Sequence, residues 1–581
     1  MIKWPPCPFQ PALSFDSNIP IGDTMILSRL APLLALASAV VATPTVTIAE
    51  PSATIIGSDG LSQVEKFNNI PFAQQPTGSL RLRPPRPLDK PLGTVEATGI
   101  SRSCPQFFFS TDNTEFPGSL VGQLANHPLL QKVVSEGEDC LGLNIRRPAG
   151  TTPESKLPVL VWFYGGGFEL GSSLMYDGTP LVSSSVDLDM PIIFVGISYR
   201  VAGFGFLPGK EVLEDGAANL GLLDQRVGLQ WVADNIAAFG GDPDRVTIWG
   251  ESAGSISVYD QMILFQGDHT YKGKPLFQGG IMSSGGATPA EPMDSKRAQR
   301  VYDKVVSVAK CDKAPSSLQC LRELEYDDLL NATNSVPGLL SYYSPALSYL
   351  PRPDGKVLTE SPERLGKAGK YARVPFIIGD QEDEGTLFAL FQSNITTTDD
   401  VVDYLSGYLW DEASREQLEE LVATYKDITT HGSPFRTGLF NNWYPQFKRL
   451  AALLGDVLFN LSRRVLLNNA AEVSPDVPSW SYLSSYNYGT PILGTVHGTD
   501  ILQVFYGILP NYASRAIHTY FFSFVYDQDP NSRRGDLMEW PQWKDKKQLM
   551  QFFNDHAELL TDDYRSDSYE VLVKIGDSLH I

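Results

Sequence analysis

Ser252 stands in the setting that most clearly predicts nucleophilic chemistry. It is the central residue of Gly-Glu-Ser-Ala-Gly at 250–254, which follows a β-rich run at 245–249 and precedes a predicted helix at 255–264. A strand, sharp turn and helix in this order form a nucleophile elbow, where flanking glycines leave room for the turn and the helix N-terminus points at the site. The pentapeptide alone also fits a Gly/Ser-rich turn, so its context decides between the two interpretations.

The context of Ser252 resembles the serine-site signature of the type-B carboxylesterase/lipase family. The block at 239–254 carries this resemblance, which continues in Glu-Asp-Cys-Leu-Gly-Leu-Asn at 138–144, Gln-Trp-Val-Ala-Asp-Asn-Ile at 230–236 and Ser-Tyr-Leu-Pro-Arg-Pro-Asp at 348–354. The similarity is to the fungal secreted lipases of the Candida and Geotrichum type in particular. It implies an α/β-hydrolase fold and the cleavage of carboxylic esters.

Three consecutive glycines at 165–167 follow a predicted buried strand at 158–164. Glycines leave backbone N–H groups unobstructed, so such a loop can hold a substrate oxygen that gains negative charge. The resemblance assigns this oxyanion role to the N–H groups of Gly166, Gly167 and Ala253. A phosphate loop is the weaker interpretation, because no Lys-Ser/Thr pair follows the glycines.

Four carboxylates fall within residues 380–384, directly after a predicted strand at 374–378. The cluster suggests calcium, but an EF-hand loop that starts at Asp380 would need glutamate at its twelfth position, where Phe391 stands. The loop instead resembles the family's acid loop, in which the glutamate directly before glycine belongs to the catalytic triad. That residue is Glu384, and we predict no metal site.

His497 is the predicted general base among seven histidines. In α/β-hydrolases the base follows the acid along the chain, and the glycine-bordered loop at 493–500 resembles the family's histidine loop. His518 lies in a predicted helix, where a packed position is expected. Ser252 would then attack an ester, His497 would carry its proton and Glu384 would orient the imidazole, without any cofactor.

Strand-like and helix-like segments alternate along the 581 residues without an obvious linker. We therefore predict one large α/β domain over residues 43–581. The resemblance implies that this domain has the α/β-hydrolase fold, with a mostly parallel, mixed central sheet flanked by helices. Residues 25–42 read as a secretory signal peptide with a short basic start and an apolar run. Residues 1–24 would be an upstream extension from an unused start codon.

Cysteine parity agrees with removal of this leader. The chain has five cysteines, and cleavage of the leader removes Cys7. The four that remain should pair in a secreted protein. Three pairings are possible, of which sequence proximity favours Cys104 with Cys140 and Cys311 with Cys320. The resemblance to fungal lipases implies the same two bridges.

The net charge of −21 argues against binding to nucleic acid or to an anionic membrane. The apolar run of the leader is too short to span a bilayer, so we predict a secreted, extracellular protein without a transmembrane segment. Asn331, Asn394 and Asn460 begin glycosylation sequons, although Asn460 lies in an apolar helical stretch where an unmodified residue is favoured.

The segment at 105–139, between the first two cysteines, is the best guide to the substrate. It is rich in apolar residues, and the equivalent loop of the related lipases is a lid, which implies transient contact with a lipid interface. Permanent packing of these side chains on the domain is the alternative. The predicted lid and acyl-chain contacts are Phe107, Phe108, Phe109, Phe116, Leu387 and Phe388.

Three functions fit these motifs. A lipase acting on acylglycerols or other lipid esters is the first, and a carboxylesterase acting on a small secondary metabolite or a sterol ester is the second. A non-catalytic cholinesterase-like binding module is the third, but such modules usually lose a triad member, and all three triad candidates are present here.

Overall fold

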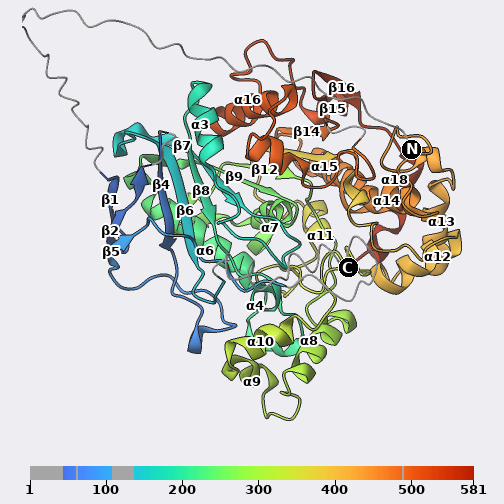
Figure 1. The fold of residues 1–581 in the computed structure, drawn as a ribbon, viewed down its shortest axis with the longest axis horizontal. Helices are drawn as coiled ribbons and strands as arrows, with labels where there is room; N and C mark the ends of the chain where they lie inside the picture. The colour runs from blue at the N-terminus through green and yellow to red at the C-terminus, as the bar shows by residue number, and fades with distance from the viewer. Residues whose placement is uncertain (1–42, 60–62, 108–135, 487–489) are drawn as a thin grey trace, which may run out of the picture. The chain divides into compact units, whose positions relative to one another are not determined.

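The computed structural model describes residues 43–59, 63–107, 136–486 and 490–581. Within them, eleven strands form one sheet in the order β16-β15-β14-β13-β12-β9-β7-β8-β6-β4-β3, which runs through the centre of the molecule (Figure 1). The strands are β3 (Ser58–Asp59), β4 (Val64–Pro71), β6 (Gly142–Pro148), β7 (Leu157–Phe163), β8 (Ile193–Ile197), β9 (Gly241–Glu251), β12 (Gly279–Ser283), β13 (Phe376–Gln381), β14 (Ser479–Ser484), β15 (Gln548–Phe552) and β16 (Ala557–Thr561).

The sheet is mixed and mostly parallel, as predicted. The seven strands from β8 to β15 in this order are parallel neighbours, whereas β16 and the strands β6, β4 and β3 pair antiparallel at the two edges. The central strands are apolar on both faces because helices cover both; β7, for example, reads Leu-Pro-Val-Leu-Val-Trp-Phe and is buried from its second residue on.

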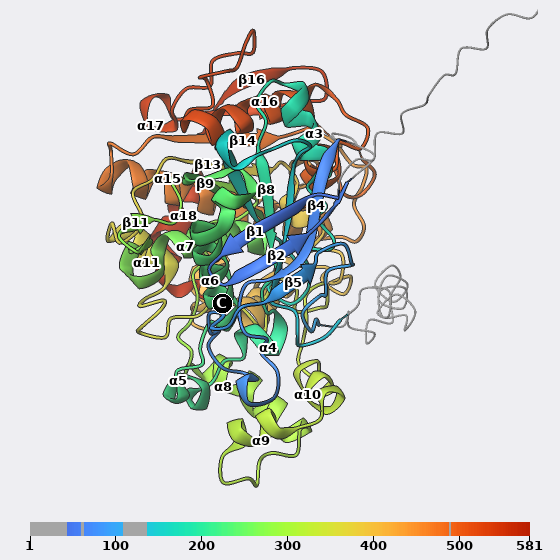
Figure 2. The same cartoon turned by 90° about the vertical axis from the view of Figure 1, so that its left-hand side faces the viewer.

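Helices lie on both sides of the sheet (Figures 1 and 2). α6 and α7 contact each other and β9, while α3 and α16 contact each other. The helices are α3 (Thr179–Asp187), α4 (Ala202–Phe206), α5 (Lys210–Asp215), α6 (Leu220–Asn235), α7 (Ala253–Gly267), α8 (Lys296–Val308), α9 (Ser317–Glu323), α10 (Tyr326–Thr333), α11 (Pro362–Lys367), α12 (Thr398–Tyr404), α13 (Arg415–Thr424), α14 (Phe447–Gly455), α15 (Leu461–Val473), α16 (Tyr512–Asp527), α17 (Trp543–Lys546) and α18 (Ser566–Ile575).

The elements predicted around the site exist, with different ends. β9 begins four residues before the predicted strand at 245–249 and continues to Glu251, directly before the elbow. α7 runs beyond the predicted end at 264, but Leu264, Phe265 and Gln266 have non-helical dihedral angles, so regular helix stops where the sequence placed it. β13 starts later than predicted and includes Asp380 and Gln381, which places the carboxyl end of this strand at the acid loop.

Two disulfides join Cys104 to Cys140 and Cys311 to Cys320, the pairs that the resemblance implies. The first closes the base of the segment at 105–139. Most of the predicted lid, including Phe108, Phe109 and Phe116, lies outside the described residues, as does the predicted leader at 1–42. Strands β1 (Thr45–Ala49), β2 (Ser52–Ile56) and β5 (Gly93–Glu96) form a separate small sheet.

No helix in the described ranges is both long enough and apolar enough to cross a membrane.

Candidate active site

Ser252 occupies the sharp turn between β9 and α7. Its backbone has φ 58° and ψ −124°, a left-handed conformation that a side chain rarely adopts and that lifts the hydroxyl away from the strand. The flanking glycines are required by space: a Cβ on Gly250 would lie 2.2 Å from the carbonyl oxygen of Gly254, and one on Gly254 would lie 2.0 Å from that of Phe163. The local sequence therefore forces the elbow that the motif predicts.

Ser252, His497 and Glu384 form one chain of hydrogen bonds. The Oγ of Ser252 lies 2.8 Å from Nε2 of His497, and Nδ1 of His497 lies 2.5 Å from Oε2 of Glu384. The other carboxylate oxygen of Glu384 accepts the backbone N–H of Gln381 at 2.7 Å, which fixes the carboxylate against β13. This geometry lets the imidazole take a proton from the serine while the carboxylate holds its tautomer.

The charge around His497 favours its protonated form. Burial by itself lowers the pKa of the imidazole, but the carboxylate of Glu384 raises it more, with a further contribution from Glu251. Oε1 of Glu251 lies 3.5 Å from Nε2 of His497, and burial raises the pKa of Glu251 to about 8. The site thus stabilises the imidazolium that forms when the serine is deprotonated.

Asp383 joins the acid loop to the histidine loop. Its Oδ2 accepts the backbone N–H of Thr495 at 2.9 Å, and its Oδ1 accepts the hydroxyl of Ser433 and the N–H of Phe435, both at 2.8 Å. The side chain of Asp383 is buried. Asp380 is likewise buried and forms a 3.0 Å ion pair with Arg463. Both carboxylates hold loops in place.

No group of three or more His, Cys, Asp or Glu side chains in the described ranges is arranged to hold a metal ion.

The glycine loop at 165–167 starts from a rigid base. Tyr164 stacks on Tyr199 with a centroid distance of 4.2 Å, and each hydroxyl donates to the other residue's backbone carbonyl at 2.6 Å. Gly166 and Gly167 have φ of 112° and 62°, which side chains disfavour. Gly167 lines the same cavity as Ser252 and Ala253. A Cβ on the neighbouring Gly166 would lie 2.4 Å from the carbonyl oxygen of Leu170, so this position also requires glycine.

Glu169 is a buried residue of this loop that the motifs did not single out. Its Oε2 accepts the backbone N–H of Leu339 at 2.6 Å, and its backbone carbonyl accepts the N–H of Phe107 at 2.7 Å. Burial raises its pKa to about 8. Glu169 therefore ties the glycine loop both to the base of the predicted lid and to Leu339, whose side chain lines the cavity above Ser252.

An apolar cavity opens at Ser252. Phe388 lines it as predicted, and its ring lies 5.1 Å from that of His497, with Phe459 at 4.9 Å on the same imidazole. Most of the wall comes from residues that no motif marks. The main apolar ones are Ile256, Leu339, Leu347, Trp410, Val457, Leu458, Phe459, Leu572, Leu579 and Ile581.

Two predicted acyl-chain contacts lie elsewhere. Leu387 is half-buried and does not line the cavity. Phe107 is buried against Tyr349, with a centroid distance of 6.2 Å, so it is packed on the domain as the alternative interpretation held. His518 is also packed, with Nδ1 2.8 Å from Oγ of Ser184.

The glycosylation candidates differ in exposure. Asn331 is exposed on helix α10, and Asn394 is also exposed. Asn460, where the sequence favoured an unmodified residue, is buried: its amide donates to the carbonyl of Gln381 at 3.3 Å, and its oxygen accepts the hydroxyl of Tyr564. A glycan has no room there.

Comparison with known proteins agrees with this geometry. The model of the carboxylesterase family matches residues 39–572. Secreted lipase 1 of Botryotinia fuckeliana is 59% identical over 93% of this chain and 94% of its own, and a secreted triacylglycerol lipase of Gibberella zeae is 57% identical over 92% and 91%. The crystal structure of Aspergillus niger EstA superposes with a TM-score of 0.78 and 26% identity, over 93% of this chain and 99% of that one. The chain belongs to the carboxylesterase family.

Proposed function

We propose that this protein is a secreted lipase that hydrolyses the ester bonds of acylglycerols. The observation that carries the proposal is the chain of hydrogen bonds from Glu384 through His497 to Ser252, which ends at the mouth of an apolar cavity. Relatives that are 59% and 57% identical over more than nine-tenths of this chain are named a secreted lipase and a secreted triacylglycerol lipase, which supports both the activity and secretion.

In the proposed reaction, Oγ of Ser252 attacks the ester carbonyl carbon while Nε2 of His497 takes its proton. The N–H groups of Gly167 and Ala253, which line the cavity beside Ser252, hold the oxygen that becomes negative, with Gly166 as the third donor of the loop. The protonated imidazole then gives its proton to the leaving alcohol, which leaves the acyl group on Ser252. Water attacks this acyl-enzyme by the same route, and a carboxylic acid leaves.

The apolar lining of the cavity favours a long acyl chain. Its apolar walls would take the hydrocarbon out of water at about 25 cal/mol per Å² of buried apolar surface, whereas a short polar ester gains little there. Long-chain glycerides are therefore the better substrates, because their binding energy grows with each methylene that enters the cavity.

We also propose transient contact with lipid surfaces near the histidine loop. Leu439 and Phe440 are 74% and 78% exposed, and Leu509, on the other side of His497 in the chain, is 83% exposed. The segment before Leu439 adjoins the histidine loop, since a Cβ on Gly494 would lie 2.7 Å from Cβ of Pro434. Exposed apolar side chains such as these suit an interface with lipid.

The test is the rate of hydrolysis of a trioleoylglycerol emulsion and of water-soluble p-nitrophenyl acetate, each taken through its solubility limit. The Ser252→Ala protein is the blank. We expect a rise in rate when emulsion forms and a preference for the long chain. Saturation below the limit with preference for acetate would instead indicate a carboxylesterase of small esters, and no serine-dependent rate on either ester would contradict hydrolysis altogether.

A further inference from the structure

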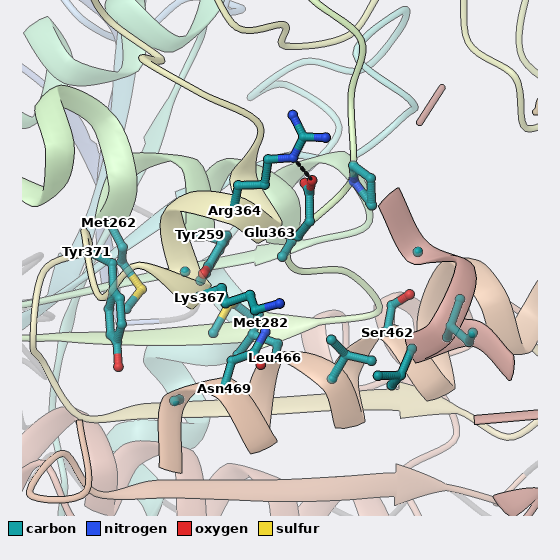
Figure 3. Close-up of a pocket in the computed structure, with 18 of the residues that line it drawn as sticks. Tyr259, Met262, Met282, Glu363, Arg364, Lys367, Tyr371, Ser462, Leu466 and Asn469 are labelled. Atoms are coloured by element: carbon teal, nitrogen blue, oxygen red, sulfur yellow. Dashed lines mark ion pairs between the residues drawn. The ribbon is translucent and has the colours of Figure 1, made fainter. Parts of the chain in front are cut away.

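A second cavity lies next to the one that opens at Ser252, and Figure 3 shows residues that line it. Its walls come from α7, α11, α15 and α18 and from the strands β12 and β13. Figure 3 shows Lys367 and Glu363 on the α11 side of this space, with Leu466, Asn469 and Ser462 on the opposite side. The proposed hydrolysis does not use this cavity.

The two cavities share a wall. Pro289, Ser462, Leu572 and Gly576 line both of them. One of these is proline, one is glycine and one is serine, so the partition is built mainly from small side chains. The second cavity therefore begins within one layer of residues from the place where the acyl chain of the substrate would lie.

More of the lining of the second cavity is apolar than polar. Met262, Met282, Phe376 and Leu466 line it and are buried, and methionine side chains adapt readily to irregular apolar ligands. These residues come from α7, β12, β13 and α15, which surround the space from different directions. Such a lining favours a hydrocarbon chain over a polar metabolite.

The mouth of this cavity carries one cation without a partner. Glu363 accepts from His580 at 3.0 Å and pairs with Arg364 at 3.8 Å, and Arg364 also lies 3.9 Å from Asp577. Lys367, in contrast, is exposed and forms no ion pair or side-chain hydrogen bond within the ranges that the structure covers. Its ammonium is thus available to a ligand, while the acidic groups at the mouth are already paired.

We propose that the second cavity binds a fatty acid, with its carboxylate on the ammonium of Lys367 and its chain among Met262, Met282 and Leu466. An apolar chain with an anionic end is the chemistry that an apolar interior and a free cation at the mouth recognise. The identity of the ligand rests on the proposed function, since hydrolysis of a lipid ester releases this kind of acid one wall away. The cavity is a binding site and not a second catalytic centre.

The test is isothermal titration of laurate, below its micelle concentration, into protein whose Ser252 carries a covalently bound dodecyl phosphonate. The phosphonate fills the first cavity, so any laurate that binds must occupy another site. We expect one laurate per molecule. Lys367→Glu should weaken it about tenfold or more, because a favourable charge becomes a repulsive one. Lys370→Glu is the matched control, since Lys370 is also exposed, follows α11 and does not line the cavity.

Three outcomes would overturn the proposal. Laurate could fail to bind to the phosphonate-modified protein, it could bind Lys367→Glu as tightly as the wild type, or its affinity could fall equally in Lys367→Glu and Lys370→Glu. Val573→Trp is a second variant at the mouth, where Val573 is 55% exposed and a large ring can block entry without disturbing the core. This substitution should also weaken the binding of laurate. If Ser252 does not react with the phosphonate and trioleoylglycerol is not hydrolysed, the proposed function fails, yet titration of unmodified protein with and without Lys367→Glu still reports on the second cavity.

Discussion

The two adjoining cavities have similar apolar walls but differ in how their polar groups are held. In the first, Glu384 is buried and fixed by the N–H of Gln381, and it orients His497 against Ser252. In the second, Lys367 is exposed and is held by no partner among the described residues. A polar group that is buried and oriented can stabilise charge that develops in a reaction, whereas a solvated one can only attract charge that is already present. The difference predicts catalysis in one cavity and binding in the other.

Ser252→Ala gives the largest contrast between the cavities. Removal of a nucleophilic serine lowers kcat by roughly 10⁶-fold in enzymes with this kind of triad, so hydrolysis of trioleoylglycerol and p-nitrophenyl acetate should both nearly vanish. Laurate binding at Lys367 should not change, because Ser252 does not line the second cavity. Rates and titrations on the same preparation check this. Near-normal hydrolysis in Ser252→Ala would refute the assignment of the nucleophile.

Glu384→Gln should lower kcat by about 10⁴-fold, the cost of a misoriented imidazole. The residual activity should also respond differently to pH. The carboxylate raises the pKa of His497, so its loss lowers that pKa. Since the base acts only when neutral, the rise of kcat/KM with pH should move to lower pH in the variant.

Profiles of kcat/KM against pH for both proteins measure this shift. Glu382→Gln is the control, because Glu382 lies in the same loop and pairs with Arg436 rather than with the histidine. An unshifted profile in Glu384→Gln would mean that another carboxylate orients the imidazole. The neighbouring Glu251, 3.5 Å from Nε2 of His497, would then be the residue to replace next.

Leu347→Trp tests the acyl side of the first cavity. The larger ring should block the chain, so kcat/KM on trioleoylglycerol should fall about tenfold to a hundredfold while that on p-nitrophenyl acetate stays within a few-fold. Ala287→Trp, which narrows the second cavity instead, is its counterpart and should leave both rates unchanged. Equal losses on the two esters in Leu347→Trp would place the acyl chain elsewhere.

The arrangement of Ser252, His497 and Glu384 in one chain of hydrogen bonds was predictable because short motifs dictate the backbone around these residues. The elbow at Ser252 needs Gly250 and Gly254 as neighbours in sequence, and the acid and histidine loops each carry their own glycine, so a resemblance in a few residues located all three side chains. The strand β9 before the elbow was also predictable from its apolar run, although its ends were not.

The cavities were not predictable in the same way. Leu339, Trp410, Phe459 and Ile581 meet in space from four distant parts of the chain, and nothing local in any of them marks a wall. Leu387 looked like a contact because it follows the acid loop, but the turn after Glu384 points Phe388 into the cavity instead. Tertiary packing decides which apolar residues face a ligand.

Glu169→Gln should change the pH dependence of stability and leave the rate of hydrolysis almost unchanged. Burial raises the pKa of Glu169 from 4.5 to about 8, so in this interval the folded protein keeps a proton that the unfolded chain releases. Stability then falls as pH rises from about 5 to 8, by at most about 1.4 kcal/mol per pH unit for one proton. Glutamine does not ionise, so the free energy of unfolding of the variant should rise relative to that of the wild type as pH increases through this interval.

Denaturant unfolding at pH 5, 6.5 and 8 measures this difference in the free energy of unfolding. The control is Lys367→Gln at an exposed position, for which the difference from the wild type should be the same at each pH. If the stability difference between Glu169→Gln and the wild type is also the same at each pH, Glu169 beside the first cavity is no more sensitive to pH than Lys367 at the mouth of the second.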